Sequence, residues 1–295
     1  MRLCSLVAIK ENLRYTYRMK TYQLGLYEKA IPDAVSCTDK LMLAKQQGYD
    51  YLEISIDESD AKLARLTYSP KQMQELLDAS IQSIPMGSMC LSGHRRFPLG
   101  SEKTAQRSLD IMEQALHFAA FMGIPIIQLA GYDVYYEEST AKTRALFTEN
   151  LHTCANLAAK YGIILAFETM ETAFMNTVEK ALEFVKIIDS PYLQIYPDLG
   201  NIVNAAYSEN KDPAKDLLMG AGHIVAVHIK ESLPGKFREI PYGTGHVDFP
   251  HLLDTCWNLG VRRYVTEFWH NSANDWKQQI VDSYDFIMSS FFANT

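Results

Sequence analysis

Four acidic or imidazole side chains stand where four apolar runs end, and their types and spacing could hold a divalent metal ion. Glu168 closes the run IILAFE, Asp198 closes LQIYPD, His228 closes IVAVH and Glu267 closes RYVTE, at intervals of 30, 30 and 39 residues. Two glutamates, one aspartate and one histidine form an oxygen-rich ligand set with one imidazole, which suits Mn²⁺, Zn²⁺, Co²⁺ or Mg²⁺. Without a cation, three carboxylates in one place would repel and raise one another's pKa.

Each of these residues also has an ordinary structural interpretation. An acid after an apolar run is most often a helix cap or a solvated loop residue. A single histidine is more often a hydrogen-bonded core residue than a ligand. A metal site therefore requires a fold that brings all four residues to one place.

The predicted elements supply such a fold. Short runs rich in β-branched and apolar residues alternate with longer segments of helical period, which predicts repeated βα units. The eight predicted strands cover residues 24–27, 51–56, 83–90, 126–131, 163–169, 193–198, 224–229 and 264–268. Units of about 37 residues match a (β/α)8 TIM barrel, an α/β fold in which the carboxyl ends of all strands meet at one mouth. The alternative is an open doubly wound sheet, but its GxGxxG turn is absent after the early strands.

One domain is expected, because no Pro/Gly/Ser-rich linker or low-complexity tract interrupts the βα units. Residues 1–20 differ from the rest, since they carry five basic residues and one acid in an otherwise acidic chain, and Met19 stands just before the first predicted strand. We therefore expect residues 1–18 to be an N-terminal extension or a segment upstream of an alternative start. Residues 19–295 are expected to form a single catalytic barrel domain.

Composition excludes several classes of protein and partner. Apolar residues make up 47% and charged residues 21%, with ordinary Gly and Pro, which excludes a disordered or collagen-like chain. The formal charge of −7 leaves no broad basic face, so nucleic acid is not an expected partner. No apolar run approaches the roughly 18 residues of a membrane span. Five scattered cysteines without a CxxC pair favour a reducing, cytoplasmic location.

Longer segments carry a resemblance to a known family. They are LGLYEKAIP, YDYLEISIDES, MCLSGHRRFPLGS, AFETMETAFMN, QIYPDLGN, VHIKESLPGKFREIPYGTGHVDF and VTEFW. The chain from residue 24 to 269 resembles the xylose-isomerase-like barrel superfamily, and within it the L-ribulose-5-phosphate (L-xylulose-5-phosphate) 3-epimerases of L-ascorbate and related sugar catabolism. YEKA, SGHRRFPLGS, YPDLGN and HIKES-PGKF are quite specific to this subgroup, whereas GTGHVDF is shared across the superfamily.

The resemblance implies a metal-dependent isomerase that interconverts L-ribulose 5-phosphate and L-xylulose 5-phosphate. A base must remove the C3 proton next to the C2 carbonyl to give an enediolate, and an acid must return a proton to the opposite face. The resemblance assigns two duties to Glu168 and Glu267, as metal ligands and as this acid/base pair. A metal bound to the sugar's carbonyl and hydroxyl oxygens would take up the developing negative charge.

A phosphorylated ketopentose needs further partners at the same mouth, above all cations or backbone amides for its phosphate. The expected substrate contacts are His94, Arg95, Arg96, Lys230, Glu53 and Glu171. Each of them could instead be an ordinary solvated or salt-bridged side chain. Two departures from the nonphosphorylated ketose 3-epimerases favour the phosphate-using branch. Asn201 stands where those enzymes have a histidine, and Pro234 stands where they have an arginine.

Three other functions stay open on the sequence alone. An aldose–ketose isomerase on the same barrel would move hydrogen between C1 and C2, usually with additional carboxylates for a second ion. A metal-dependent endonuclease acting on abasic DNA would need more ligands and a basic groove. A noncatalytic sugar-binding barrel would give no reason for two glutamates on either side of a metal. The segments WHNSANDW and FIMSSFF could form a homodimer contact or could pack the last helix on the barrel.

Overall fold

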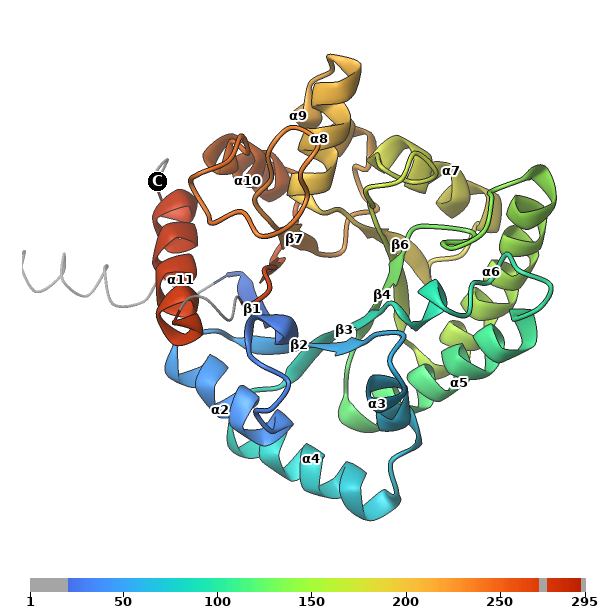
Figure 1. Cartoon of the computed structure of the whole chain (residues 1–295), viewed down its shortest axis with the longest axis horizontal. Coiled ribbons are helices and arrows are strands. Elements are labelled where there is room, and N and C mark those ends of the chain that lie inside the picture. Colours follow the sequence, from blue (N-terminus) through green and yellow to red (C-terminus); the bar gives the residue numbers. More distant parts are fainter. Residues whose placement is uncertain (1–20, 271–274, 293–295) are drawn as a thin grey trace, which may run out of the picture.

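Eight strands form one sheet that curls into a barrel, with helices around its outside (Figure 1). The computed structural model describes residues 21–270 and 275–292. All seven strand pairs are parallel, and the strand order in the sheet is β6-β5-β4-β3-β2-β1-β8-β7. The strands are β1 (Gln23–Tyr27), β2 (Tyr51–Ile56), β3 (Met86–Leu91), β4 (Ile126–Ala130), β5 (Ile164–Glu168), β6 (Leu193–Tyr196), β7 (Val227–Ile229) and β8 (Arg263–Thr266). The predicted TIM barrel is confirmed.

The barrel closes between β6 and β7 through isolated bridges rather than through a continuous ladder. Ile195 pairs with Ile224, and Asp198 pairs with His228. The amide of His228 donates to the carbonyl of Pro197 at 2.9 Å. This closure brings two of the four predicted metal ligands side by side.

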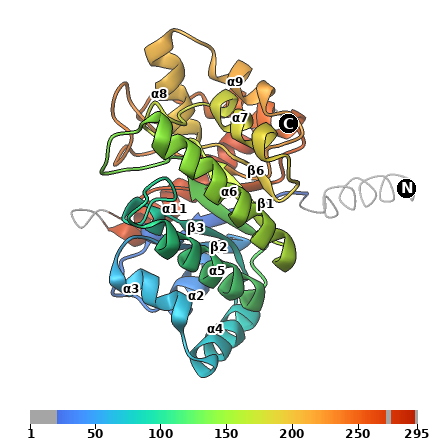
Figure 2. The same cartoon turned by 90° about the vertical axis from the view of Figure 1, so that its right-hand side faces the viewer.

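Helices follow the strands and cover the outside of the barrel, as the side view shows (Figure 2). The α-helices are α2 (Cys37–Gln46), α3 (Asp60–Leu63), α4 (Pro70–Gln82), α5 (Ala105–Met122), α6 (Ala141–Tyr161), α7 (Val178–Ile188), α8 (Leu199–Glu209), α9 (Pro213–Met219), α10 (Phe249–Asn258) and α11 (Trp276–Phe292). Short 3-10 turns are η1 (Glu28–Ala30), η2 (Ala64–Thr67) and η3 (Gly93–Arg95). A capping box of Ser69 and Gln72 begins α4, because hydroxyl and carboxamide groups satisfy the free amides of a first turn.

Side chains fill the inside of the barrel, so it is a packed core rather than a channel. Tyr51 extends from β2 across the neighbouring strands and donates a hydrogen bond to the Tyr264 carbonyl at 3.0 Å. A Cβ atom at Gly25 of β1 or Gly87 of β3 would overlap the Tyr51 ring. These two strand glycines therefore make room for one large aromatic side chain below the mouth.

Two of the strands begin three residues later than predicted. The third strand was expected from residue 83, but α4 continues to Gln82 and the strand begins at Met86, after Pro85, which lacks a backbone N–H for a ladder. The seventh strand was expected over 224–229, but only Val227–Ile229 is a strand.

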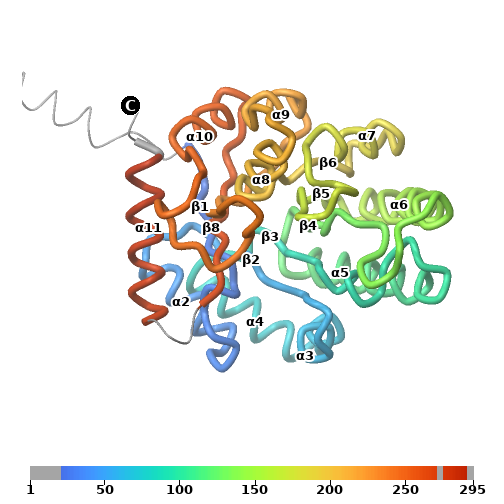
Figure 3. The backbone as a smooth tube through the Cα atoms, turned by 45° about the horizontal axis from the view of Figure 1, so that its top comes forward, coloured from blue at the N-terminus to red at the C-terminus, as the bar shows by residue number. Residues whose placement is uncertain are grey.

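The last helix packs against the barrel rather than projecting from it. Ile280 and Ile287 of α11 are buried, and α11 lies beside α10 (Figure 3). The homodimer stays a prediction. The expected start at Met19 and the extension over 1–18 fall outside the described residues, and the extent of the domain also stays a prediction. Within the part of the chain that the structure describes, no helix is long and apolar enough to cross a membrane.

Candidate functional site

The structure brings the four predicted metal ligands together at the carboxyl ends of β5 to β8. Glu168 is the last residue of β5, His228 lies within β7, and Asp198 and Glu267 follow β6 and β8. All four side chains are buried, and one ligand atom from each lies within 4.8 Å of the others. A group of this kind could hold a metal ion, since three carboxylates and one imidazole are the donors that suit a divalent cation.

Local structure fixes the Asp198 carboxylate. Asp198 is the N-cap of α8, and its Oδ1 accepts the Asn201 amide at 2.8 Å. Its own amide donates to Thr169 Oγ1 at 3.0 Å. A Cβ at Gly200 would lie 2.9 Å from the Lys230 carbonyl oxygen, so glycine lets the first turn of α8 approach the segment after β7 closely. The helix cap occupies one carboxylate oxygen and leaves Oδ2 for the centre of the cluster.

Glu53 holds the imidazole of His228 from the opposite side of the cluster. Glu53 Oε1 lies 2.6 Å from His228 Nε2, while its Oε2 accepts from Ser88 Oγ at 2.6 Å and Tyr196 OH at 2.9 Å. His228 Nδ1 faces the glutamates, 2.9 Å from Glu168 Oε1 and 3.1 Å from Glu267 Oε2. A carboxylate behind a ligating histidine fixes the ring and makes it a better ligand. Glu53 thus lies behind a predicted metal ligand, and its predicted hydroxyl-binding or supporting role stays a prediction.

Lys230 lies inside the acidic cluster. Its Nζ is 2.6 Å from Asp198 Oδ2 and 3.8 Å from Glu267 Oε2, and it donates to Asn201 Oδ1 at 2.9 Å. The side chain is buried among these acceptors rather than extended toward the rim. It was predicted as a phosphate contact, but here its charge offsets part of the negative charge of the carboxylates.

Burial and neighbouring charges shift the pKa values of the cluster in different directions. Burial raises the pKa of Asp198 to about 7, against the opposing charge of Lys230. Burial would also raise the pKa of Glu267, but the charges of His228 and Lys230 outweigh burial. The pKa of Glu267 therefore lies below its usual range. Burial would lower the pKa of His228, yet three surrounding glutamates hold it well above the ordinary value. The raised pKa of His228 thus reflects the surrounding carboxylates, whereas the lowered pKa of Glu267 reflects the two buried cations beside it.

Two buried oxygens make the donor set suitable for a cation. Asp198 Oδ2 and Glu267 Oε2 accept no hydrogen bond of good geometry, although charged nitrogens lie 2.6 and 3.1 Å away. Buried carboxylate oxygens are normally hydrogen-bonded or coordinated. The residues present therefore fit a divalent metal ion held by Glu168, Asp198, His228 and Glu267.

Gln128 is a site residue that the sequence reasoning missed. It lies on β4, is fully buried, and donates through Nε2 to Glu168 Oε2 at 2.6 Å. Its Oε1 has no hydrogen-bond partner among the described residues. The signal was a single amide within the apolar run IIQLA, at a position that alternation directs to the inside of the barrel.

The three predicted phosphate contacts after β3 have different surroundings. His94 is buried, and its Nε2 lies 3.1 Å from the Ser108 carbonyl. Burial lowers the pKa of His94 to about 4, so the ring is uncharged near neutral pH and is a poor partner for phosphate. Arg96 is exposed and forms an ion pair with Asp60 at 2.7 Å. Arg95 is partly buried and stacks on Tyr135, with its guanidinium carbon 4.6 Å from the ring centroid.

Glu171 lies at the rim of the mouth, where Arg238 donates to its Oε1 at 3.1 Å. Arg238 also lies 5.4 Å from the Trp269 ring centroid, and Lys230 lies 6.0 Å from the same ring. A cavity of about 40 Å³ between these groups is also lined by Glu267. The loops after β5 and β7 therefore meet over the candidate metal centre.

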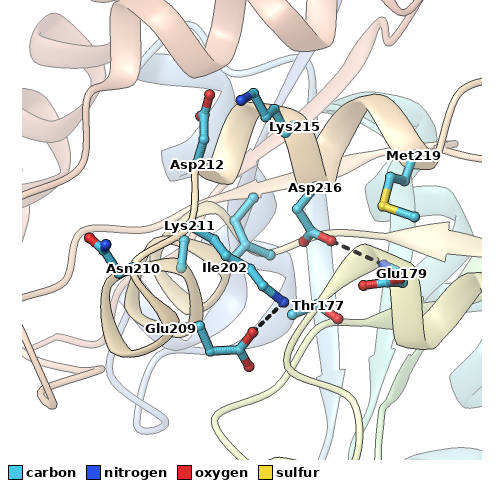
Figure 4. Close-up of a pocket in the computed structure, with 11 residues that line it drawn as sticks. Thr177, Glu179, Ile202, Glu209, Asn210, Lys211, Asp212, Lys215, Asp216 and Met219 are labelled. Atoms are coloured by element: carbon cyan, nitrogen blue, oxygen red, sulfur yellow. Dashed lines mark hydrogen bonds and ion pairs between the residues drawn. The ribbon is translucent and has the colours of Figure 1, made fainter.

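A larger cavity of about 570 Å³ lies between α7, α8 and α9 (Figure 4). Several of its charged side chains already have partners. Lys211 forms an ion pair with Glu209 at 2.6 Å, and Asp216 accepts the backbone amides of Val178 and Glu179 at the start of α7. The four strand-end residues do not line this cavity. It is not part of the candidate site.

Comparison with known proteins identifies relatives over nearly the whole chain. The family model described as xylose isomerase-like TIM barrel matches residues 41–289. L-ribulose-5-phosphate 3-epimerases named UlaE, from Shigella sonnei strain Ss046 and Escherichia coli strain SMS-3-5, are each 41% identical over 272 residues, which is 91% of this chain and 94% of theirs.

Solved structures show the same fold at low sequence identity. The 3-keto-D-glucoside 4-epimerase YcjR from E. coli matches with a TM-score of 0.74 at 19% identity, over 91% of this chain and 99% of its own. A structure of L-ribulose 3-epimerase matches with a TM-score of 0.72 at 17% identity, over 92% of this chain and 95% of its own. At this level of identity the two likenesses establish the fold alone.

Proposed function

The chain belongs to the xylose isomerase-like TIM barrel family, and we propose that it is a metal-dependent 3-epimerase that interconverts L-ribulose 5-phosphate and L-xylulose 5-phosphate. The observation that carries the proposal is the buried cluster of Glu168, Asp198, His228 and Glu267. The 41% identity to proteins named L-ribulose-5-phosphate 3-epimerase supports the substrate. A cytoplasmic location remains a prediction, to which the four free thiols in the described part of the chain lend support.

We assign the acid/base roles to Glu168 and Glu267. They reach the cluster from β5 and β8, on either side of Asp198 and His228. One carboxylate takes the C3 proton; the C–H electron pair becomes the C2–C3 double bond, and the carbonyl pair moves onto O2. The other glutamic acid then gives a proton to the opposite face of C3. After one turnover the two glutamates have exchanged protonation states, which prepares the enzyme for the reverse direction.

The remaining residues of the cluster hold this pair in position. Gln128 donates to Glu168, and Glu53 fixes His228 against both glutamates. Lys230 adds a positive charge beside Glu267 and Asp198. A divalent ion held by the four ligands would supply positive charge next to the substrate oxygen that becomes negative. The direct test of the function is conversion of L-ribulose 5-phosphate to L-xylulose 5-phosphate by the Mn²⁺-loaded protein; no conversion would contradict it.

The two catalytic alternatives make different demands on the site. An endonuclease with three metals needs many more ligands, and in residues 21–270 and 275–292 the four-residue cluster is the sole group of three or more potential ligands. An aldose–ketose isomerase could use the same cluster, but it would exchange hydrogen at C1 or C2. The position of hydrogen exchange therefore separates it from the epimerase.

Metal binding gives a prediction that does not depend on turnover. We expect Asp198→Asn to weaken Mn²⁺ binding by more than about 100-fold, because it removes a charged ligand. Glu53→Gln is expected to weaken it by about 10- to 100-fold, as loss of a carboxylate behind a ligating histidine typically does. Isothermal titration calorimetry of the metal-stripped proteins measures both effects.

The matched control for this prediction is Glu209→Gln. Glu209 is a carboxylate on the same helix as the Asp198 cap, but at its opposite end, where it pairs with Lys211. Its replacement should leave Mn²⁺ binding within about twofold. Equal Mn²⁺ affinities for wild type and Asp198→Asn would exclude Asp198 as a ligand.

A further inference from the structure

Lys230 is the only lysine or arginine in residues 21–270 and 275–292 that forms an ion pair with the four-residue cluster. Its Nζ lies 2.6 Å from Asp198 Oδ2 and 3.8 Å from Glu267 Oε2. These are the two buried carboxylate oxygens that accept no hydrogen bond of good geometry. The ammonium group therefore lies against the same oxygens that make the donor set suitable for a metal ion.

Burial ties Lys230 to this position. The residue is only 5% exposed, and its Nζ also donates to Asn201 Oδ1 at 2.9 Å. Asn201 is itself held, because its Nδ2 donates to the Thr169 carbonyl at 2.8 Å. The Trp269 ring centroid lies 6.0 Å from the ammonium. A buried ammonium is costly unless it is paired, and here its paired charges come from the metal ligands themselves.

The charge balance of the site links Lys230 to metal binding. Four buried carboxyl groups lie at the site, on Glu53, Glu168, Asp198 and Glu267. The charge of Lys230 offsets part of their negative charge, and a divalent ion bound to the cluster would offset more of it. The ammonium and the ion would be like charges in one buried site, where Coulomb repulsion is stronger than in water. Each therefore reduces the stabilisation that the other gains from these carboxylates.

We propose that Lys230 is a counter-ion that competes with the metal: it stabilises the metal-free protein and lowers the affinity of the site for a divalent ion. This inference rests on the metal site of the proposed function. A lysine that only held Asp198 in place would have the opposite effect, since its loss would loosen a ligand and weaken metal binding. The sign of the change in metal affinity therefore separates the two roles.

The first measurement is calorimetric titration of the metal-stripped proteins with Mn²⁺ at one fixed pH. Lys230→Met removes the charge and keeps an unbranched side chain of similar length. It is expected to tighten Mn²⁺ binding by at least about 10-fold, because the repulsion between the ammonium and the ion is lost. Lys230→Gln keeps a hydrogen-bond donor without the charge, and it should change the affinity in the same direction.

The second measurement is urea unfolding of wild type and Lys230→Met, with and without saturating Mn²⁺. Without metal, the variant should unfold at lower urea, since its carboxylates have lost their counter-ion. With Mn²⁺ the difference should shrink, because a ligand stabilises most the folded protein that binds it most tightly. The two measurements form one thermodynamic cycle, so the gain in Mn²⁺ affinity must match the recovery of stability on metal loading.

Lys211→Met is the matched control. Lys211 also lies 2.6 Å from a carboxylate, that of Glu209, but the pair is exposed beyond the end of α8, away from the cluster (Figure 4). Its replacement should leave Mn²⁺ affinity within about twofold. Unchanged or weaker Mn²⁺ binding in both Lys230 variants would overturn the proposal. If a variant does not fold without metal, chelator competition from the loaded protein gives its affinity, and the same criterion applies.

A turnover assay with L-ribulose 5-phosphate separates failure of this inference from failure of the proposed function. If wild type converts the sugar phosphate and the Lys230 variants bind Mn²⁺ no more tightly, the counter-ion role falls and the function stands. If the variants bind Mn²⁺ more tightly but loaded wild type converts no sugar phosphate, the counter-ion role stands and the proposed function falls.

Discussion

Replacing Glu168 or Glu267 by glutamine should lower epimerase turnover by about 10²- to 10⁴-fold while leaving the barrel folded. Glutamine keeps the shape of the side chain but cannot take a proton from C3 or return one. Both residues are buried beside His228, so a carboxylate from the protein surface cannot take over their role. The measurement is kcat for L-ribulose 5-phosphate, with circular dichroism to confirm folding.

Two controls make this result specific to the acid/base role. Glu102→Gln changes an exposed glutamate that pairs with Lys142, and it should keep wild-type turnover. Mn²⁺ titration of both active-site variants shows how much of the loss comes from weaker metal binding. A variant with near wild-type turnover would remove that glutamate from the acid/base pair.

The second large effect concerns stability and lies outside the proposed active site. Glu28→Gln should reduce the free energy of unfolding by about 3–5 kcal/mol, because it removes the buried counter-charge of Lys40, Lys62 and Arg65. Of these cations, the two lysines keep only the exposed carboxylate of Asp33 as a partner. The Glu28 carboxylate is fully buried and accepts from Lys40 at 3.1 Å, Lys62 at 2.7 Å and Arg65 at 2.7 Å. It also accepts the Ser55 amide at 2.8 Å. One side chain thus joins the loops after β1 and β2.

The pH dependence of this effect follows from the direction of the Glu28 pKa shift. Burial would raise the pKa of Glu28, but Arg65, Lys40 and Lys62 outweigh burial and hold it well below its usual range. A carboxyl whose pKa is lower in the folded state stabilises the protein above its unfolded pKa of about 4.3 and loses that contribution as the pH falls further. The difference between wild type and Glu28→Gln should therefore be largest near neutral pH and shrink in acid.

Urea unfolding of the two proteins measures the stability difference. Glu75→Gln is the control, since Glu75 is a glutamate with an ion-pair partner, Lys71 at 3.8 Å, but on the exposed surface of α4. Exposed pairs of this spacing contribute only about 0.3–0.5 kcal/mol. If Glu28→Gln lowers the free energy of unfolding by less than about 1 kcal/mol, then Lys40, Lys62 and Arg65 find other partners and the prediction is wrong.

The sequence predicted the candidate site best for residues whose place in the barrel depends only on the strand that carries them. The four residues at the ends of apolar runs could be predicted to converge, because all strands of a parallel barrel present their carboxyl ends at one mouth. The structure shows that Glu168, Asp198, His228 and Glu267 do converge. Strand limits were less predictable where helix and loop contacts decide them, as at Met86 after α4.

Pairwise contacts between distant segments could not be read from local patterns. Glu53 lies 175 residues from His228 along the chain, so its hydrogen bond depends on closure of the barrel. Arg95 and Arg96 are adjacent in sequence, yet one stacks on Tyr135 and the other pairs with Asp60. The sequence does not distinguish two adjacent arginines, because their surroundings depend on which loop each side chain contacts in the fold.

The central claim is that the two glutamates exchange the hydrogen at C3 of a ketopentose phosphate. Incubation of the Mn²⁺-loaded protein with L-ribulose 5-phosphate in D₂O, followed by proton NMR, tests it most directly. We expect the C3 proton signal to disappear as deuterium enters, in wild type but not in Glu168→Gln or Glu267→Gln. Deuterium at C1 or C2, or product formation without any deuterium at C3, would contradict it.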